Sequence, residues 1–313
     1  MTRPTARARV GWRPGLTARR QRTWPWFVPI IAMMVLVFAY PVIEIVRLSF
    51  TDAMLGSSEA NYTLESYERM FNDPAFATSL RVTFTFAITS VVFQVLCGFA
   101  IALLLYEASR LRIRGTVIVR TIVLSAWAIP GVVVGIVWTL IYQESAAGIL
   151  NHLLSPIFGV DNIPFLSDPN LALVSAIVAS VWRGTAMSMI FCYAGLQTIP
   201  HELREAAAVD GASWWRQLRS VVIPLLIPIL AVNVITVTVE TFNTFDMMMV
   251  LTGGGPGYMT EVLALRVYNA IFDQFRMGQG AATAVVLLII DALIIAVFLW
   301  LTNRSRRANA DTN

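Results

Sequence analysis

The side chains that are able to do covalent or metal chemistry are few and scattered in this 313-residue chain. Its two histidines, His152 and His201, are far apart, and its two cysteines, Cys97 and Cys192, both lie in apolar runs. Zinc and haem sites need ligands at short, regular spacings, and a disulfide framework needs a larger set of cysteines. We therefore expect no metal site, no catalytic residues and two buried thiols.

Arginine supplies all 23 basic side chains, and lysine is absent from the chain. A P-loop holds the phosphates of a nucleotide with a lysine. This chain therefore cannot supply a complete P-loop. Any ATP hydrolysis of that kind must take place on another polypeptide, and we expect no cofactor in this one.

The composition predicts an integral membrane protein. Hydrophobic residues make up 57% of the chain and charged residues 13%, whereas roughly a quarter of the residues of a soluble domain are charged. A transmembrane helix needs about 20 mostly apolar residues, and six such runs occur, approximately at 26–50, 79–106, 117–142, 171–196, 223–245 and 281–301. The first run is too long for a signal-peptide core and is not followed by a small-residue cleavage site, so we expect it to be retained.

The arginines predict the orientation of the spans, because cytoplasmic flanks carry an excess of basic residues. Seventeen arginines flank the ends that we assign to the cytoplasm, and four lie on the opposite side. We therefore expect an all-α, multi-pass membrane protein, with six transmembrane helices and both termini cytoplasmic. Residues 25–302 form its membrane domain, between an Arg-rich tail at 1–24 and a second tail at 303–313. We expect the first tail to face lipid rather than nucleic acid.

Two ionisable side chains lie at similar depths in the fourth and sixth spans. At about 1.5 Å per residue from the external end of each span, Asp291 lies roughly 15 Å deep and Arg183 roughly 18 Å deep. Charged groups within a membrane usually face a cavity or each other. We expect either an ion pair between Arg183 and Asp291 or an Arg183 that faces a second membrane subunit.

Polar side chains on the fifth span share one helical face. They recur at i, i+3, i+7 and i+10 or i+11, and they are Asn233, Thr236, Glu240 and Asn243 or Thr244. Such a face suits a sugar, because its hydroxyls need new hydrogen-bond partners when they leave water. The alternative is that these side chains bind neighbouring helices. Further candidates for a substrate pathway are Asp246, Ser188 and Tyr193.

The segment between the fourth and fifth spans, residues 199–222, carries signals for two short helices joined at a glycine. Pro200 suits the first position of a helix. Gly211 is able to adopt the left-handed conformation that ends a helix after Asp210. Ser213 is then placed to cap a second helix. We expect a hinged elbow on the cytoplasmic side.

The first helix of this elbow has the surface of a docking element. Its alanines, 206–208, make it thin, and Glu205 and Asp210 offer carboxylates to a partner. The segment resembles the "EAA" signature of ABC-importer permeases through Glu205, Ala206, Ala207, Asp210, Gly211 and Ala212, followed by Pro224 and Pro228. Leu218 stands where many members of that family have phenylalanine, which affects only the packing expected there.

This resemblance implies the ABC type I importer permease fold and a location in a bacterial plasma membrane. In that family the first short helix is the coupling helix, which sits in a cleft of an ATPase subunit, and the resemblance gives this role to residues 200–210. It also implies that ATP and Mg²⁺ bind to a partner ATPase, present as a homodimer or as a pair of different subunits.

A second group of residues is similar to sugar permeases of the maltose and glycerol-phosphate type. It includes Phe242, Asn243, Phe245, Asp246, Thr260 and the glycine-rich stretch 251–256. The resemblance implies a second homologous permease subunit, an extracytoplasmic sugar-binding lipoprotein and a sugar substrate. The large external domain of the maltose permease is missing here, so shorter disaccharide permeases, including those for trehalose, look nearer.

A secondary, ion-coupled transporter of a small polar solute is the alternative function. Such a transporter is expected to have broken helices in paired halves, and we find no inverted pairing among the six spans. Dependence of uptake on ATP and a separate ATPase would distinguish the two functions, because a secondary transporter would use an ion gradient alone.

Overall fold

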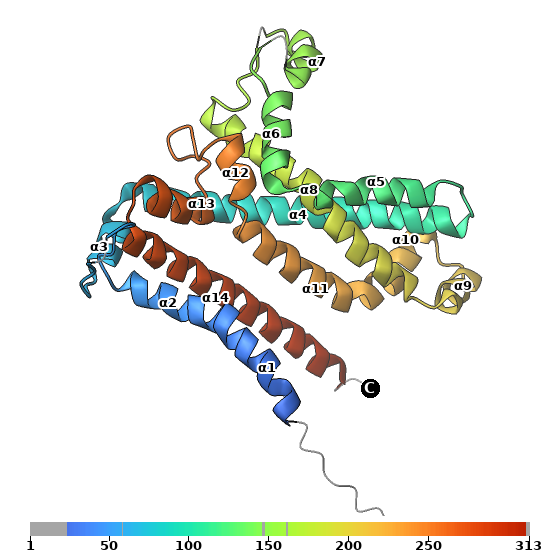
Figure 1. Ribbon diagram of the computed structural model, residues 1–313. Helices are drawn as coiled ribbons and strands as arrows, with labels where there is room; N and C mark the ends of the chain where they lie inside the picture. Colours follow the sequence, from blue (N-terminus) through green and yellow to red (C-terminus); the bar gives the residue numbers. More distant parts are fainter. Residues whose placement is uncertain (1–23, 58, 146–147, 161, 311–313) are drawn as a thin grey trace, which may run out of the picture. The chain divides into compact units, whose positions relative to one another are not determined.

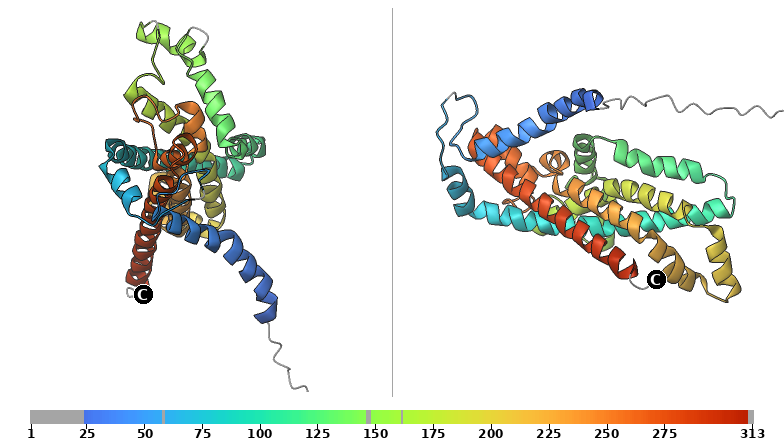
Figure 2. Two further views of the ribbon diagram at one scale, coloured as in Figure 1. Left: turned by 60° about the vertical axis from the view of Figure 1, so that its left-hand side comes forward. Right: turned by 90° about the horizontal axis from the view of Figure 1, so that it is seen from below.

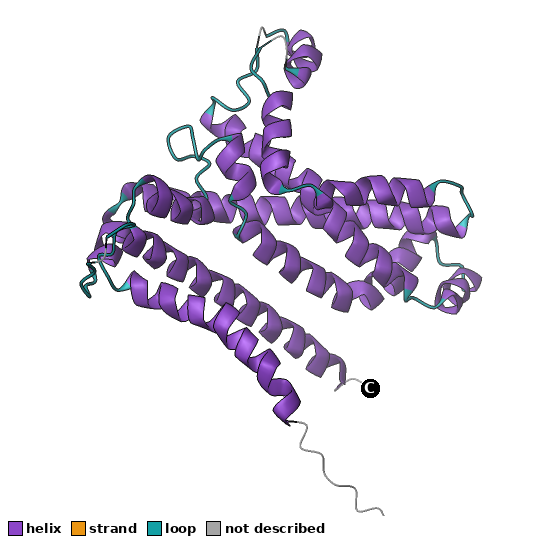
Figure 3. Ribbon diagram, in the orientation of Figure 1, coloured by secondary structure: helices purple, strands orange, loops and turns teal. Residues whose placement is uncertain are grey.

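The computed structural model describes residues 24–57, 59–145, 148–160 and 162–310 (Figure 1). Within these residues it contains helices and loops and no strand (Figure 3). The Arg-rich tail expected at 1–24 lies outside the described residues apart from Trp24, as do the last three residues of the chain.

The described residues divide after Glu44 into two compact units, which are described in turn. In the first unit, helix α1 (Trp24–Met34) continues through the π-helical turn η1 (Val35–Ala39) into α2 (Tyr40–Ser49), whose residues from Ile45 onward belong to the second unit. The apolar segment Trp26–Ser49 is long enough to cross a membrane. It confirms the first predicted span.

The second unit contains the remaining helices, whose ends are fixed mainly by prolines, glycines and acidic caps. They are α3 (Glu65–Asn72), α4 (Pro74–Arg110), α5 (Thr116–Ala128), α6 (Gly131–Ile141), α7 (Ile149–Phe158), α8 (Pro169–Gln197), α9 (His201–Val209), α10 (Trp214–Gln217), η2 (Leu218–Val222), α11 (Ile223–Phe242), α12 (Asp246–Leu251), α13 (Leu263–Tyr268), η3 (Asn269–Asp273) and α14 (Met277–Ala310). Helices α4 and α8 begin in the same way, with a proline that follows a capping aspartate, Asp73 or Asp168.

Four long apolar segments of this unit correspond to predicted spans. They are Pro74–Arg110, Pro169–Gln197, Trp214–Phe242 and Met277–Thr302. The helices extend beyond the predicted runs, because polar residues at a membrane surface continue a helix as readily as apolar ones. The tail expected at 303–313 is accordingly helical as far as Ala310.

The third predicted span, 117–142, is wrong as a single helix. It consists of α5 and α6, which meet at an angle of 101°, and α6 turns away from α5 in Figure 1. Pro130 has no N–H to donate and disfavours a helical conformation in the residue before it. Ile129 is accordingly extended, with φ −75° and ψ 129°. The Ile-Pro-Gly sequence was the signal for this break.

Helices α4 and α8 pack side by side as the central pair of the second unit (Figure 2). Small residues permit this contact, as is usual between membrane helices. A Cβ atom at Gly98 of α4 would lie only 2.8 Å from the backbone nitrogen of Met189, and one at Gly184 of α8 would collide with the side chain of Gln94. Four alanines of α8 are completely buried: Ala172, Ala176, Ala179 and Ala186.

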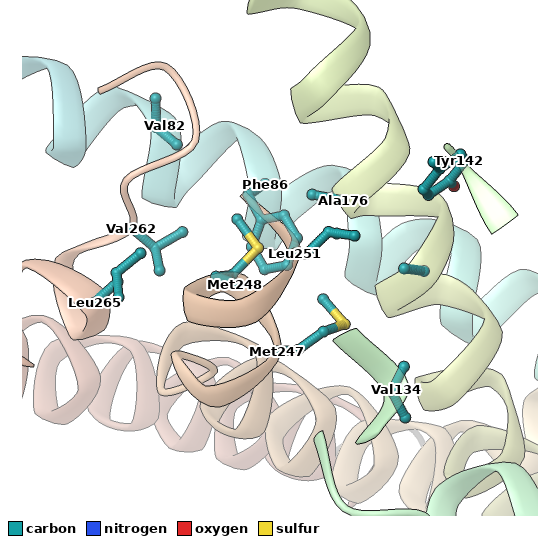
Figure 4. Packing of buried hydrophobic residues seen from close by; sticks show 11 residues of the cluster. Val82, Phe86, Val134, Tyr142, Ala176, Met247, Met248, Leu251, Val262 and Leu265 are labelled. Atoms are coloured by element: carbon teal, nitrogen blue, oxygen red, sulfur yellow. The ribbon is translucent and has the colours of Figure 1, made fainter. Parts of the chain in front are cut away.

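Two apolar clusters fix the two ends of this pair. The cluster on the external side joins α4, α6, α8 and α12 through Phe86, Val134, Ala176, Met247 and Met248, among others (Figure 4). The cluster on the cytoplasmic side includes Ala102, Leu105, Cys192, Leu196 and Leu226. Close packing at both ends holds the middle of α4, α8 and α11 in a defined register.

The two external segments have structure of their own. The segment 51–78 contains α3 and an isolated β-bridge between Thr51 and Tyr62. In the second segment, residues 143–170, α7 is held by buried Asn151, whose side-chain amide makes hydrogen bonds with the backbone of Gln143 and Ile163.

Candidate functional site

The first helix of the cytoplasmic elbow forms as predicted. Helix α9 follows Pro200 and ends at Asp210, and Gly211 has a φ of +77°. The backbone N–H of Gly211 donates to Ala208 O at 3.0 Å, and that of Ala212 donates to Ala207 O at 2.9 Å. These bonds use carbonyls that the end of a helix leaves without partners.

The second helix of the elbow differs from its prediction. Helix α10 continues without a break through η2 into α11, so it is the cytoplasmic end of the fifth span rather than a separate helix. Ser213 occupies the capping position in an extended conformation, but its side chain makes no capping hydrogen bond. The hinge of the elbow therefore lies at residues 210–213, between α9 and one long helix.

Most of α9 is available to a partner. Glu205, Ala206, Asp210 and Gly211 are exposed, and Ala207 and Ala212 are half-buried. Large apolar side chains lie exposed beside them, with Val209 at 87% and Trp215 at 72% exposure. Exposed apolar groups bordered by carboxylates are typical of protein docking surfaces.

A polar cavity lies among α4, α8 and α11, within the membrane-spanning part of the chain. Its volume is about 20 Å³, room for about one water molecule, and it is lined by Gln94, Ser180, Arg183, Gly184, Glu240, Thr241, Thr244 and Met247. Gln94 Nε2 donates to the backbone and hydroxyl oxygens of Ser180 at 3.1 Å. Trp127 Nε1 donates to Glu240 Oε1 at 3.3 Å. The cavity therefore combines an amide, a guanidinium and a carboxylate.

The expected ion pair between Arg183 and Asp291 is wrong for the described residues, which show no such pair. Asp291 Oδ2 instead accepts a hydrogen bond of 2.9 Å from Asn243 Nδ2. Arg183 lies on α8, which packs against α4, α5 and α11, and Asp291 lies on α14, which packs against α11 and α13. The two side chains therefore do not meet, although their depths are similar. Arg183 and Glu240 line the same cavity.

The polar residues of the face predicted on the fifth span do not all line this cavity. Asn233 is fully buried, and its Nδ2 lies 4.0 Å from Cys192 Sγ. Thr236 donates to its own helix, at Val232 O. Glu240 and Thr244 of this face line the cavity, together with Thr241 of the same span. The contacts of Asn233 and Thr236 favour helix packing for those two residues. Asp246 lies against Gly131, where a Cβ atom would collide with its carboxylate.

The two candidates on the fourth span are also outside the cavity. Ser188 is fully buried and faces Gly98 of α4. Tyr193 lies toward the cytoplasmic side, with its hydroxyl 3.3 Å from Ser109 Oγ and Arg120 over its ring.

Of the two thiols expected to be buried, Cys192 is buried but Cys97 is exposed on the surface of α4. The prediction for Cys97 rested on an apolar run alone. Such a run does not distinguish a side chain in the protein core from one that faces lipid.

The external glycine-rich loop is anchored by a charge network that the sequence analysis missed. Gly253, Gly254 and Gly257 have left-handed φ angles, and Glu261 and Arg266 follow them. Arg266 Nη1 donates to Glu261 Oε2 at 2.9 Å, and its Nη2 donates to Asp73. Glu261 Oε2 also lies 2.7 Å from Ser79 Oγ. The network ties the loop to the start of α4.

The second external segment also holds a carboxylate in a set of donors. Glu144 Oε1 accepts hydrogen bonds of 2.7 Å from the N–H groups of Leu166 and Ser167, and Oε2 accepts one from the Ser167 hydroxyl. Partial burial raises the pKa of the Glu144 carboxyl, but these hydrogen bonds lower it further than burial raises it. The net effect holds the pKa below its ordinary value.

The fold and the elbow define a helical membrane protein that spans the bilayer several times and presents an exposed short helix at one surface. Residues 94–308 match the family of binding-protein-dependent transport system inner membrane components. The chain belongs to this family. It is therefore a multi-pass inner membrane protein and a permease subunit of an ABC importer, which is not itself catalytic.

Relatives and a solved structure agree with this assignment. The chain is 35% identical to the trehalose/maltose transport system permease protein MalF of Thermococcus litoralis, over 75% of this chain and 78% of the relative. It is 33% identical to the sn-glycerol-3-phosphate transport system permease protein UgpA of Brucella abortus, over 87% and 91%. The fold matches a chain of the bacterial alginate ABC transporter in complex with an alginate pentasaccharide-bound periplasmic protein, with a TM-score of 0.76, 21% identity, and 92% and 96% coverage.

Proposed function

We propose that this chain is one of two homologous permease subunits of an ATP-driven importer, and that its substrate is a sugar, specifically a disaccharide such as trehalose. The observation that carries the proposal is the exposed helix α9, which ends at the left-handed Gly211. The names of the relatives MalF and UgpA support a sugar or a polyol derivative as the class of substrate.

Because this chain is not catalytic, other subunits must hydrolyse the ATP. A pair of ATPase subunits binds ATP and Mg²⁺, and one of them receives α9 through Glu205, Ala206, Ala207, Asp210, Gly211 and Ala212. An extracytoplasmic lipoprotein delivers the sugar to the external side. Nucleotide binding to the ATPases then shifts the permease between its outward-open and inward-open states, because the nucleotide binds the ATPase arrangement of one state more tightly.

The side chains that line the polar cavity are the ones within this chain that best suit a sugar. The cavity itself has room for about one water molecule, so it must widen during transport to admit a sugar. Sugar hydroxyls both donate and accept hydrogen bonds, and the cavity offers a guanidinium donor at Arg183, a carboxylate acceptor at Glu240 and an amide at Gln94. Gly184 leaves room for the Gln94 amide, because a side chain at position 184 would collide with it. Glu240 is therefore the strongest of the predicted pathway residues.

Reconstituted vesicles test the proposal. The full complex, with the lipoprotein and radiolabelled trehalose outside, should accumulate sugar only when ATP is present with the ATPases. Uptake by this chain alone, driven by an ion gradient, would instead establish the secondary transporter.

Two substitutions in the elbow test the coupling role. Gly211→Pro and Glu205→Lys should abolish uptake without changing the affinity of the lipoprotein for sugar. Gly115→Pro is a matched control, because Gly115 also lies in an open turn with a positive φ of +97°, so proline introduces comparable strain outside the elbow. Normal uptake by either elbow variant would refute the assignment.

A further inference from the structure

One charged side chain of the elbow is buried although the helix around it is exposed. Arg204 is the buried residue of α9, with 5% of its surface exposed. Its Nη2 donates to Glu107 Oε1, near the cytoplasmic end of α4, at 2.6 Å. Its guanidinium carbon also lies 5.7 Å from the centre of the Tyr106 ring. Arg204 therefore connects α9 to two neighbouring residues of α4.

Burial of the Arg204 guanidinium destabilises the protein unless Glu107 and Tyr106 stay in contact with it. A guanidinium remains charged at all physiological pH values, and burying it is unfavourable without an opposing charge in good geometry. The Glu107 carboxylate and the face of the Tyr106 ring supply that compensation. A second ring contact adds to it, since His201 of α9 stacks on Tyr106 with a centroid distance of 6.5 Å and an angle of 15°.

The flanks of the elbow rest on the same end of α4. Ile199 and Leu218 belong to the apolar cluster that includes Leu105 and Tyr106. Apolar contacts of this kind tolerate sliding, because they have no fixed direction. The hydrogen-bonded pair of Arg204 and Glu107 is directional, so it fixes the position of α9 along α4.

Helix α4 extends from this contact to the polar cavity. Glu107 and Gln94 lie on one uninterrupted helix, about 20 Å apart at 1.5 Å per residue. A displacement of the Glu107 end is therefore transmitted to Gln94 through continuous helix, without an intervening loop.

We propose that Arg204 is a positioning residue that locks α9 to α4, so that a movement of the docked elbow moves Gln94 at the cavity. This inference rests on the proposed docking of α9 to an ATPase. It assigns a role to the pair Arg204 and Glu107, and it requires α9 and the cytoplasmic end of α4 to move together during transport.

The first test compares Arg204→Leu with Arg110→Leu in the full complex. Arg110 is the matched control, because it pairs with the same Glu107 carboxylate at 3.9 Å but is 42% exposed. Arg204→Leu should still co-purify with the ATPases, keep the trehalose concentration for half-maximal uptake, and lose about tenfold in maximal rate, a typical size for coupling between sites. Arg110→Leu should behave as the unsubstituted complex does. An unchanged maximal rate for Arg204→Leu would overturn the proposal.

The second test replaces the ion pair by a covalent link, and it decides the matter if Arg204→Leu fails to assemble. Glu107→Cys and Arg204→Cys are introduced together in a Cys97→Ala, Cys192→Ala background and joined by a bifunctional thiol reagent. Linked complexes should regain uptake that unlinked ones lack, since the link restores joint movement. If the link leaves uptake blocked while the cysteine-free background transports, α9 must move relative to α4 and the proposal is wrong. Absence of ATP-dependent uptake in that background would refute the proposed function instead.

Discussion

The charge network below the external glycine loop should make Glu261 far more important to stability than Asp73, although both bind Arg266. Glu261 and Arg266 have side-chain exposures of 4% and 8%, whereas that of Asp73 is 36%. Removing one partner of a buried ion pair costs about 3–5 kcal/mol, because the other charge stays buried. In the Glu261→Gln variant, Arg266 still has Asp73 as an ion-pair partner. We therefore expect a loss of unfolding free energy at the lower end of this range, about 3 kcal/mol.

Asp73→Asn is the matched comparison for this substitution. Asparagine caps a helix about as well as aspartate, so the bond from the Ala75 N–H to the residue 73 side chain is retained. The lost interaction is then a partly exposed ion pair, worth at most about 1 kcal/mol.

Detergent-solubilised protein, unfolded by titration with sodium dodecyl sulfate, measures both free energies of unfolding under one condition. The reasoning predicts that Glu261→Gln loses about 2 kcal/mol more than Asp73→Asn. Equal losses, or a larger loss for Asp73→Asn, would show that burial does not set the strength of this network.

Three further predictions concern other parts of the chain. Gly98→Val should destabilise the protein by about 1–3 kcal/mol, because its side chain separates α4 from α8; chemical unfolding measures this. Gly184→Val should displace Gln94 into the cavity and abolish trehalose uptake, and co-purification with the ATPases should remain normal. The pKa of Glu144 is lowered by folding, so its stabilising effect is present above its ordinary value of 4.5 and is lost as the pH falls through the folded-state pKa. Hydrogen exchange at the Leu166 amide should therefore lose protection below about pH 4.5, and Glu144→Gln should remove this pH dependence.

Local signals in the sequence predicted the first helix of the elbow and most spans correctly. Gly211 and Pro200 restrict the backbone at their own positions, so the ends of α9 follow from neighbouring residues alone. The break at Pro130 likewise follows from the backbone restrictions of adjacent residues. It was missed because the apolar run across it satisfies the length of a span, although the residues needed to predict it are adjacent.

The polar cavity and the charge network depend on tertiary packing. Arg183 and Asp291 match in depth, but a helix also has a rotation about its axis, and that is set by the helices it packs against. Gln94 is a single polar residue in an apolar helix and shows no pattern by itself. Arg266 and Asp73 are separated by 193 positions, so no spacing along the chain indicates their contact.

The docking of α9 is the central claim, and site-directed photocrosslinking in the assembled, ATP-hydrolysing complex tests it most directly. A photoreactive amino acid in place of Val209, which is 87% exposed on α9, should form a covalent adduct with the ATPase subunit. The same amino acid in place of Tyr258, which is 55% exposed on the external loop, should form none. Absence of an ATPase adduct at position 209 in an active complex would contradict the account.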